Sequence, residues 1–338
     1  MMLLSFITIF FLVLMLFRLS CSKKMENLDR DKTKCAKGIL ALFIVLHHVS
    51  YVTTSECLAE FVYWGNVVCG CFFFLSGYGL MKSLKVKGDL YLNNFLFCHF
   101  IKLFLPLILV AFVFALLYNI LPSRIEYNIL QDLFSGKTFV PNTWFVFALA
   151  ILYAFFYVSY CVFGITIKSH VCLLILTIGY VLLSLLVGLQ SYWYSSVLAF
   201  PLGVFIADKE KWLFRLQPLK VLGIVALLVG GALSMALYSL YISPITYAPI
   251  LCTIYPMFVY IMLLHIPLPA NNKALKKLGD ISYEVYIVHG IVVLYLLDLL
   301  NGVSLLFTGL GISIFISVYL NKVSAFYIKK IIKWRKIY

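Results

Sequence analysis

The chain of 338 residues is 64% hydrophobic and only 12% charged, with a mean hydropathy of +1.03. Soluble domains are about 45–50% apolar and about 25% charged, so a water-soluble fold of this length could not hide so much apolar surface. The net charge of +14 is carried by short segments between apolar runs, which indicates membrane topology rather than nucleic-acid binding.

Apolar runs follow one another along the whole sequence. A transmembrane helix needs about 20 predominantly apolar residues. The runs lie at 2–18, 36–54, 61–81, 95–121, 142–163, 171–189, 193–207, 219–242, 246–266, 281–299 and 303–327. The sequence therefore predicts an all-α, polytopic membrane protein with about eleven transmembrane helices and no separate soluble domain.

The first run differs from a secretory signal peptide. Its basic residues Arg18, Lys23 and Lys24 follow the apolar stretch instead of preceding it, and a small-residue cleavage signature is lacking. We expect a retained helix whose N-terminus lies outside. The expected organisation is an N-terminal transmembrane helix at 1–24 followed by a membrane domain at 25–338.

The distribution of Lys and Arg predicts the orientation of the chain. If the first helix ends in the cytoplasm, only Arg124 and Lys137 fall outside, both in the longest external loop. The positive-inside rule thus favours an external N-terminus and a cytoplasmic C-terminus in a multi-pass protein of the bacterial inner or plasma membrane. No metal site is predicted, because the nine Cys show no ligand spacing and an HEXXH motif is lacking.

Ionisable groups inside the expected spans are the first candidates for a functional site, because they are costly in a bilayer unless they face a cavity. Lys37 begins one span, and His48 follows about 16 Å along the same helix. His289 lies about 13 Å into another helix that starts near Asp280. A neutral imidazole in a dry cavity can remove a proton from a hydroxyl, and a cation at the cytoplasmic mouth can hold a phosphate. The alternative is that each His bonds a neighbouring helix for packing.

Six segments, in order, resemble motifs of the acyltransferase type 3 family of membrane O-acyltransferases. They are KGILALFIVLHH (37–48), CFFFLSGYGLMKS (71–83), HFIKLFLP (99–106), NTWFVFALAILY (142–153), FPLGVFIA (200–207) and ISYEVYIVHG (281–290). The first resembles the family hallmark of a basic residue, ten intervening residues and a His. In two of these segments another residue stands where the family usually has arginine. Lys37 replaces the usual Arg of the first segment, and His99 and Lys102 replace the arginines of an R-x-x-R stretch.

The resemblance implies a fold of ten core helices, here with one added at the N-terminus, and an activity that moves an acyl group, expected to be acetyl. The donor would be acyl-CoA as co-substrate, with no bound cofactor. The acceptor would be a hydroxyl of a cell-surface polysaccharide, a glycan precursor or a glycolipid. His48 and His289 are implied as catalytic, and Lys37, Lys102 and His99 as donor-binding. The implied lining residues are Ser76, Gly77, Tyr78, Trp144, Tyr51, Tyr283, Tyr286 and Glu284.

Several of these residues have simpler alternative roles. Ser76 and Gly77 can be a small-residue helix contact, and Trp144 and Tyr51 can belong to an interfacial aromatic belt. Lys102 can snorkel toward headgroups. Glu284 can pair with Lys37 or Lys102, or stay hydrated. These alternatives are open at the level of sequence, as is the oligomeric state.

A transporter or flippase for a lipid-linked sugar or small solute is the rival function, because such proteins also place polar residues near mid-membrane. Transporters often contain inverted repeats with broken helices in matching halves. Pro106, Pro201 and Pro256 interrupt spans here, but no repeat is evident by eye. The ordered motifs therefore favour the enzyme.

Overall fold

The computed structural model describes residues 30–53, 55–120, 137–215, 252–253, 255–256, 259–260 and 272–335. The expected first helix, most of the external loop, the run at 219–242 and most of the run at 246–266 lie outside these residues. The described part is helical and contains no strand, which confirms the all-α prediction. Its α-helices are α2 (Arg30–Val52), α3 (Gly65–Lys87), α4 (Phe95–Ile120), α6 (Trp144–Phe163), α7 (Ile167–Val187), α8 (Ala199–Arg215), α11 (Lys273–Asp280), α12 (Ser282–Leu296) and α13 (Gly302–Arg335).

Six helices of the described part are long and apolar enough to cross a membrane, and the number rises to seven if α11 and α12 form one bent span. These two helices meet at an angle of 72°. Each apolar run that falls within the described residues corresponds to a helix. The total of about eleven spans stays a prediction, since the other runs lie outside these residues.

The run expected at 193–207 is displaced along the chain. Residues 191–198 form a 3-10 turn and further turns, and α8 begins only at Ala199. Pro201 falls in the first turn of α8, where its missing N–H costs no helical hydrogen bond. The helix then continues through Asp208 and Glu210, because both carboxylates find partners on neighbouring helices. Hydropathy alone ends the helix before its charged residues and therefore predicts a range that lies too early in the chain.

Glycines allow two pairs of helices to meet at backbone distance. A Cβ placed on Gly77 of α3 would overlap the carbonyl oxygen of Phe200, and one on Gly203 of α8 would overlap that of Phe74. The contact is thus reciprocal, as expected for small residues at a helix interface in a membrane. It ties the centre of α3 to α8.

A similar contact joins α2 to α11. A Cβ on Gly38 would lie 2.6 Å from the carbonyl oxygen of Leu275, and one on Gly279 would overlap that of Lys34. Ion pairs flank this contact, between Lys34 and Asp280 at 2.8 Å and between Lys276 and Asp31. The Gly that follows Lys37 therefore lets α2 and α11 touch.

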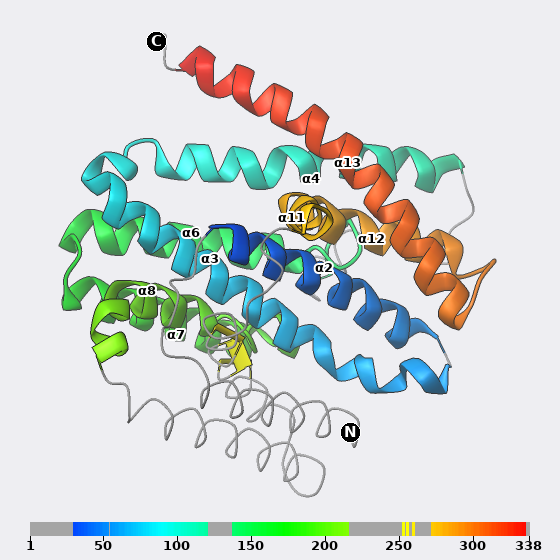
Figure 1. Ribbon diagram of the computed structural model, residues 1–338, viewed down its shortest axis with the longest axis horizontal. Coiled ribbons are helices and arrows are strands. Elements are labelled where there is room, and N and C mark those ends of the chain that lie inside the picture. Colours follow the sequence, from blue (N-terminus) through cyan, green and yellow to red (C-terminus); the bar gives the residue numbers. More distant parts are fainter. Residues whose placement is uncertain are drawn as a thin grey trace, which may run out of the picture.

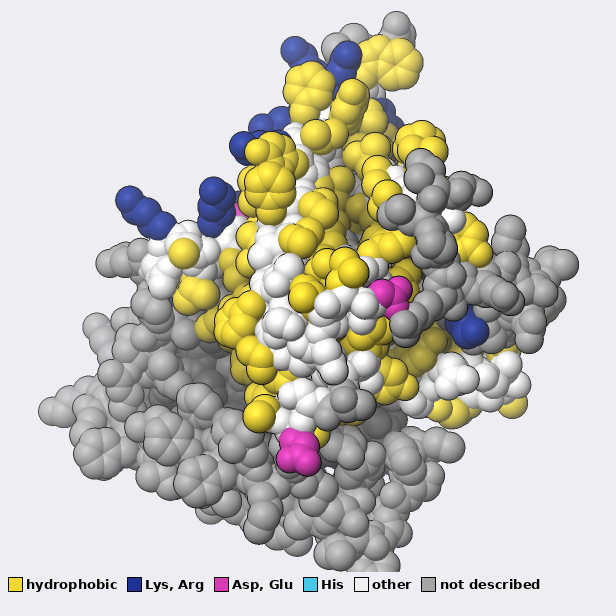
Figure 2. Space-filling view, turned by 90° about the vertical axis from the view of Figure 1, so that its right-hand side faces the viewer, with side chains coloured by type: hydrophobic (Ala, Val, Ile, Leu, Met, Phe, Trp, Pro, Cys, Tyr) yellow, Lys and Arg dark blue, Asp and Glu magenta, His cyan; other side chains and the backbone are white. Residues whose placement is uncertain are grey.

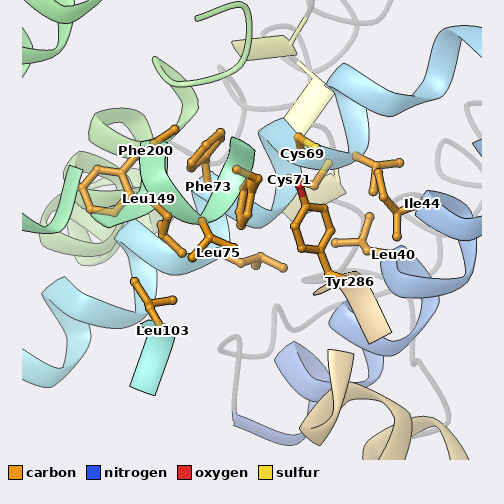
Figure 3. Close-up of a cluster of buried hydrophobic side chains, with 14 of the residues drawn as sticks. Leu40, Ile44, Cys69, Cys71, Phe73, Leu75, Leu103, Leu149, Phe200 and Tyr286 are labelled. Atoms are coloured by element: carbon orange, nitrogen blue, oxygen red, sulfur yellow. The ribbon is translucent and has the colours of Figure 1, made fainter. Parts of the chain in front are cut away.

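Figure 1 shows how the helices are arranged, and the side chains buried between them are apolar and aromatic. Tyr286 projects from α12 toward Cys69 and Cys71 of α3, and Leu40 and Ile44 of α2 lie beside it (Figure 3). At the periphery, α4, α7 and α13 expose apolar side chains along much of their length. Figure 2 shows apolar side chains over most of the described part of one face, with most Lys and Arg side chains gathered in its upper part. This distribution is typical of a protein whose outer helices face lipid.

We predict that Gly203→Ala destabilises the protein, because the new methyl group must displace the backbone of α3. Overpacking of this kind typically costs about 1–3 kcal/mol. Thermal unfolding of the purified full chain in detergent measures the effect as a lower apparent melting temperature. Gly79→Ala is the matched control, because a Cβ at Gly79 meets nothing within 4 Å. Equal melting temperatures for the two variants would contradict the contact.

Candidate functional site

Two imidazoles from separate helices meet inside the structure. The rings of His48 on α2 and His289 on α12 have centroids 4.8 Å apart. His289 is fully buried, and its Nδ1 lies 3.2 Å from the carbonyl oxygen of Val285. Because a carbonyl only accepts, Nδ1 carries the proton and Nε2 presents a lone pair. Among the described residues this buried Nε2 has no hydrogen-bond partner.

The position of His289 follows from how α12 is held. The chain bends between α11 and α12, and the Ser282 hydroxyl donates to the carbonyl oxygen of Gly279 at 2.9 Å. Farther along α12, the Tyr283 hydroxyl donates to the carbonyl oxygen of Leu103 on α4. The Tyr286 hydroxyl donates to the carbonyl oxygen of Asn142. Three successive contacts thus fix the helix that carries His289.

Lys37 shares a face of α2 with His48. Eleven residues at 3.6 per turn make slightly more than three turns, so the two side chains leave the helix in nearly the same direction. Lys37 is half-buried and forms no ion pair with the residues that the structure describes. The cation is therefore available to a ligand that approaches His48 along this face.

The segment before α6 packs against α12 next to His289. Asn142 has a positive φ of 64°, a conformation that Asn tolerates better than most residues. A Cβ on Gly290 would lie 2.7 Å from the carbonyl oxygen of Pro141 and 3.3 Å from the amide nitrogen of Asn142. Residues 141–142 therefore lie directly beside His289. Sequence reasoning did not single out Asn142, because an Asn before a span looks like an ordinary loop residue.

Trp144 and Tyr51 lie in different surroundings. Trp144 is 8% exposed and packs with Phe73, at a centroid distance of 6.5 Å, and with Tyr192, at 5.4 Å. It is thus enclosed by protein and is not part of an exposed belt. Tyr51 is 71% exposed, and its ring faces His47 at 6.5 Å. His47 itself is held by a contact of 3.2 Å between its Nδ1 and the carbonyl oxygen of Phe61.

The predicted lining segment of α3 contacts α6 and α8. Ser76 lies near the Tyr153 hydroxyl of α6, and Gly77 makes the backbone contact with α8. The Tyr78 hydroxyl donates to Oε1 of Glu210 at 2.5 Å. No contact joins these three residues to the two imidazoles within the described part of the chain. Their role as lining residues remains a prediction.

Glu210 was not predicted as a functional residue. It is 5% exposed and accepts from Tyr78, from Tyr260 at 3.0 Å and from Lys82 at 2.6 Å. Two residues earlier on α8, Asp208 contacts Lys85 at 3.0 Å and His170 at 3.1 Å. Sequence gave no signal for these clusters, because their members come from separate helices.

The predicted donor-binding pair on α4 is divided between two neighbourhoods. His99 lies against α6 and the turn before α4, with centroid distances of 5.4 Å to Tyr153 and 5.9 Å to Tyr91. Lys102 instead lines a cavity between α4, α12 and α13. Glu284 lies in the same cavity, where its Oε1 accepts from the Asn321 amide at 2.8 Å. Neither Lys102 nor Lys37 forms an ion pair with Glu284 within the described residues.

Comparison with protein families matches residues 31–322 to a family model described as an acyltransferase domain, that of acyltransferase type 3. The chain belongs to the acyltransferase type 3 family. Comparison with curated proteins and with solved structures finds no significant match. The family assignment supports a membrane acyltransferase over the rival transporter.

The geometry suits the chemistry of an acyltransferase. The site offers one half-buried imidazole, a second imidazole with a free lone pair and a cation on the face of α2 that leads to them. A hydroxyl placed at the pair could give up a proton without access to bulk water. The chain therefore holds an imidazole that can act as a base and a cation on the same face of α2.

We predict that Tyr286→Phe loosens the segment beside His289 in this acyltransferase, because the Asn142 carbonyl loses its donor. A lost neutral hydrogen bond costs about 1 kcal/mol, so local opening should increase about fivefold. Hydrogen–deuterium exchange of the purified chain should show faster exchange over 137–143. Tyr283→Phe is the control, since its lost bond leads to α4, and it should leave 137–143 unchanged. The idea fails if both variants alter this segment equally.

Proposed function

We propose that the chain is a membrane O-acyltransferase that moves an acetyl group from cytoplasmic acetyl-CoA to a hydroxyl of a cell-surface polysaccharide, glycan precursor or glycolipid. The observation that carries this proposal is the contact between His48 and His289 with the unpartnered Nε2 of His289. The family to which the chain belongs supports the reaction class.

In the proposed reaction, His48 is the general base. A ring nitrogen of His48 takes the proton of the acceptor hydroxyl while the acceptor oxygen attacks the thioester carbonyl. The C–S bond then breaks, and the CoA thiolate leaves and takes up the proton from His48. The new ester stays on the acceptor, so protons and electrons balance without a further reactant.

His289 is proposed to support the charge that forms on His48. Its Nδ1–H is held by the Val285 carbonyl, so the Nε2 lone pair stays directed away from that bond. A lone pair beside the His48 ring stabilises the imidazolium that exists during the transfer.

Lys37 is proposed to hold the phosphates of the donor. It lies on the face of α2 that carries His48, about 16 Å before it along the helix axis. An ammonium group attracts phosphate as a point charge and lacks the two-pronged geometry of Arg. The donor would thus enter from the end of α2 where Lys37 lies, with its acyl group directed toward the histidines.

We predict that His48→Ala abolishes acetylation. Loss of a general base typically lowers the rate by about 10²–10⁴-fold. Mass spectrometry of surface polysaccharide and glycolipid, from cells that express equal amounts of each variant, measures the acetyl content. His170→Gln is the control, because His170 contacts Tyr160 and Asp208 instead of the pair. Unchanged acetyl content with His48→Ala would refute the role of His48.

A second test concerns the donor. Lys37→Gln removes the charge and should raise the KM for acetyl-CoA about tenfold or more, with little change in kcat, because the contact serves binding. Lys37→Arg keeps the charge and should stay close to wild type. Initial rates of transfer from radiolabelled acetyl-CoA in membrane vesicles give both constants. A fall in kcat alone would show that Lys37 does not bind the donor.

A further inference from the structure

A cavity of about 560 Å³ lies between α4, α12 and α13. Three contacts between the helices frame it. Asn321 of α13 donates to Glu284 of α12, and Tyr283 of α12 donates to the Leu103 carbonyl of α4. The Arg335 guanidinium of α13 lies 4.0 Å from the centroid of the Phe97 ring on α4. The cavity is therefore a built feature of the fold and not a chance gap.

The mouth of the cavity is basic. Lys102, Lys329 and Lys333 all line it, and their side chains form no ion pair with any residue in the described part of the chain. Lys329 and Lys333 are four residues apart, so they lie on one face of α13. Three neighbouring ammonium groups favour a ligand with more than one negative charge.

The inner end of the cavity carries a buried carboxylate and neutral polar side chains instead of lysines. Glu284 is 5% exposed, and its Oε2 is buried without a hydrogen-bond partner among the described residues. Asn321 and Ser324 lie beside it, and the walls between the two ends are apolar. A buried carboxylate oxygen without a partner is costly, so this end is complementary to a hydrogen-bond donor.

The two ends are separated along α13. Lys333 lies twelve residues after Asn321, which is about 18 Å at 1.5 Å per residue. A fitting ligand is thus elongated, with phosphates at one end and N–H or O–H groups farther along. An anionic phospholipid offers the phosphate, but its acyl chain would leave the Glu284 oxygen unpaired.

We propose that this cavity binds the nucleotide and pantetheine part of the CoA donor. This inference rests on the acyl-CoA donor of the proposed function. CoA carries more than one phosphate: those not held by Lys37 contact Lys102, Lys329 and Lys333, and an amide or hydroxyl of the pantetheine arm donates to Glu284. Lys329 and Lys333 lie beyond the residues that match the family, so the structure, not the family, assigns them.

The two lysines of α13 bear on a place where the sequence departs from the family motif. In the stretch that resembles R-x-x-R, the first basic position is His99, and its ring packs against Tyr91 and Tyr153. Only Lys102 of this stretch reaches the cavity. Lys329 and Lys333 therefore supply positive charge to the cavity that the α4 stretch provides only through Lys102.

Calorimetric titration of CoA into the purified full chain in detergent tests the proposal. The double variant Lys329→Gln/Lys333→Gln should bind CoA at least about tenfold more weakly, as expected for the loss of charge-assisted contacts. Lys322→Gln/Lys330→Gln is the matched control. It also removes two charges from exposed lysines of α13, but neither lysine lines the cavity. The control should bind within twofold of wild type, about the limit of such a comparison.

A second pair of titrations tests the contribution of each end of the cavity to binding. Adenosine 3′,5′-bisphosphate carries phosphates but no pantetheine arm. Glu284→Gln should weaken binding of CoA and leave binding of the bisphosphate unchanged, whereas the lysine variant should weaken both. Equal melting temperatures of the variants verify that the fold is intact.

The outcomes distinguish this inference from the proposed function. If wild type binds CoA and the lysine variant binds it equally well, the cavity is not the donor site, while the proposed function stands. If the lysine variant loses binding to phosphatidylglycerol vesicles and keeps CoA, the cavity belongs to a lipid headgroup and the inference is overturned. If wild type does not bind CoA, the proposed donor and this inference both fail.

Discussion

The backbone contact between α2 and α11 is the constraint on which the site depends. Gly38 and Gly279 let the two helices touch, and the flanking ion pairs fix their register. Because α12 follows α11 after a sharp bend, the same contact sets where α12 runs relative to α2. His48 and His289 meet as a result. The histidine pair is thus produced by the packing of glycines that carry no chemistry themselves.

Within one helix, sequence was a reliable guide. The spacing of Lys37 and His48 and the depth of His289 follow from helix geometry, and both imidazoles do lie together. The all-α class followed from the composition together with the length of the apolar runs. The position of α8 could not be predicted in this way. Hydropathy cannot detect that the charged residues near its end form hydrogen bonds and ion pairs with other helices.

Contacts between helices could not be predicted in the same way. His99 and Lys102 are three residues apart, yet one packs against aromatic rings and the other lines a cavity. Which of them faces a ligand depends on the rotation of α4, and no pattern in α4 encodes that rotation. The buried partners of Glu210 were equally hidden, since Tyr78, Lys82 and Tyr260 lie far from it in sequence.

Lys37 and His48 belong to a single unbroken helix, whereas His289 belongs to another. The separation of the cation and the first imidazole along the axis is therefore set by the geometry of a single helix, at about 16 Å. Motions that change the distance between α2 and α12 alter the contact of His48 with His289 but leave the distance between Lys37 and His48 unchanged. A donor whose arm is much shorter than this distance could be held at Lys37 without ever reaching His48.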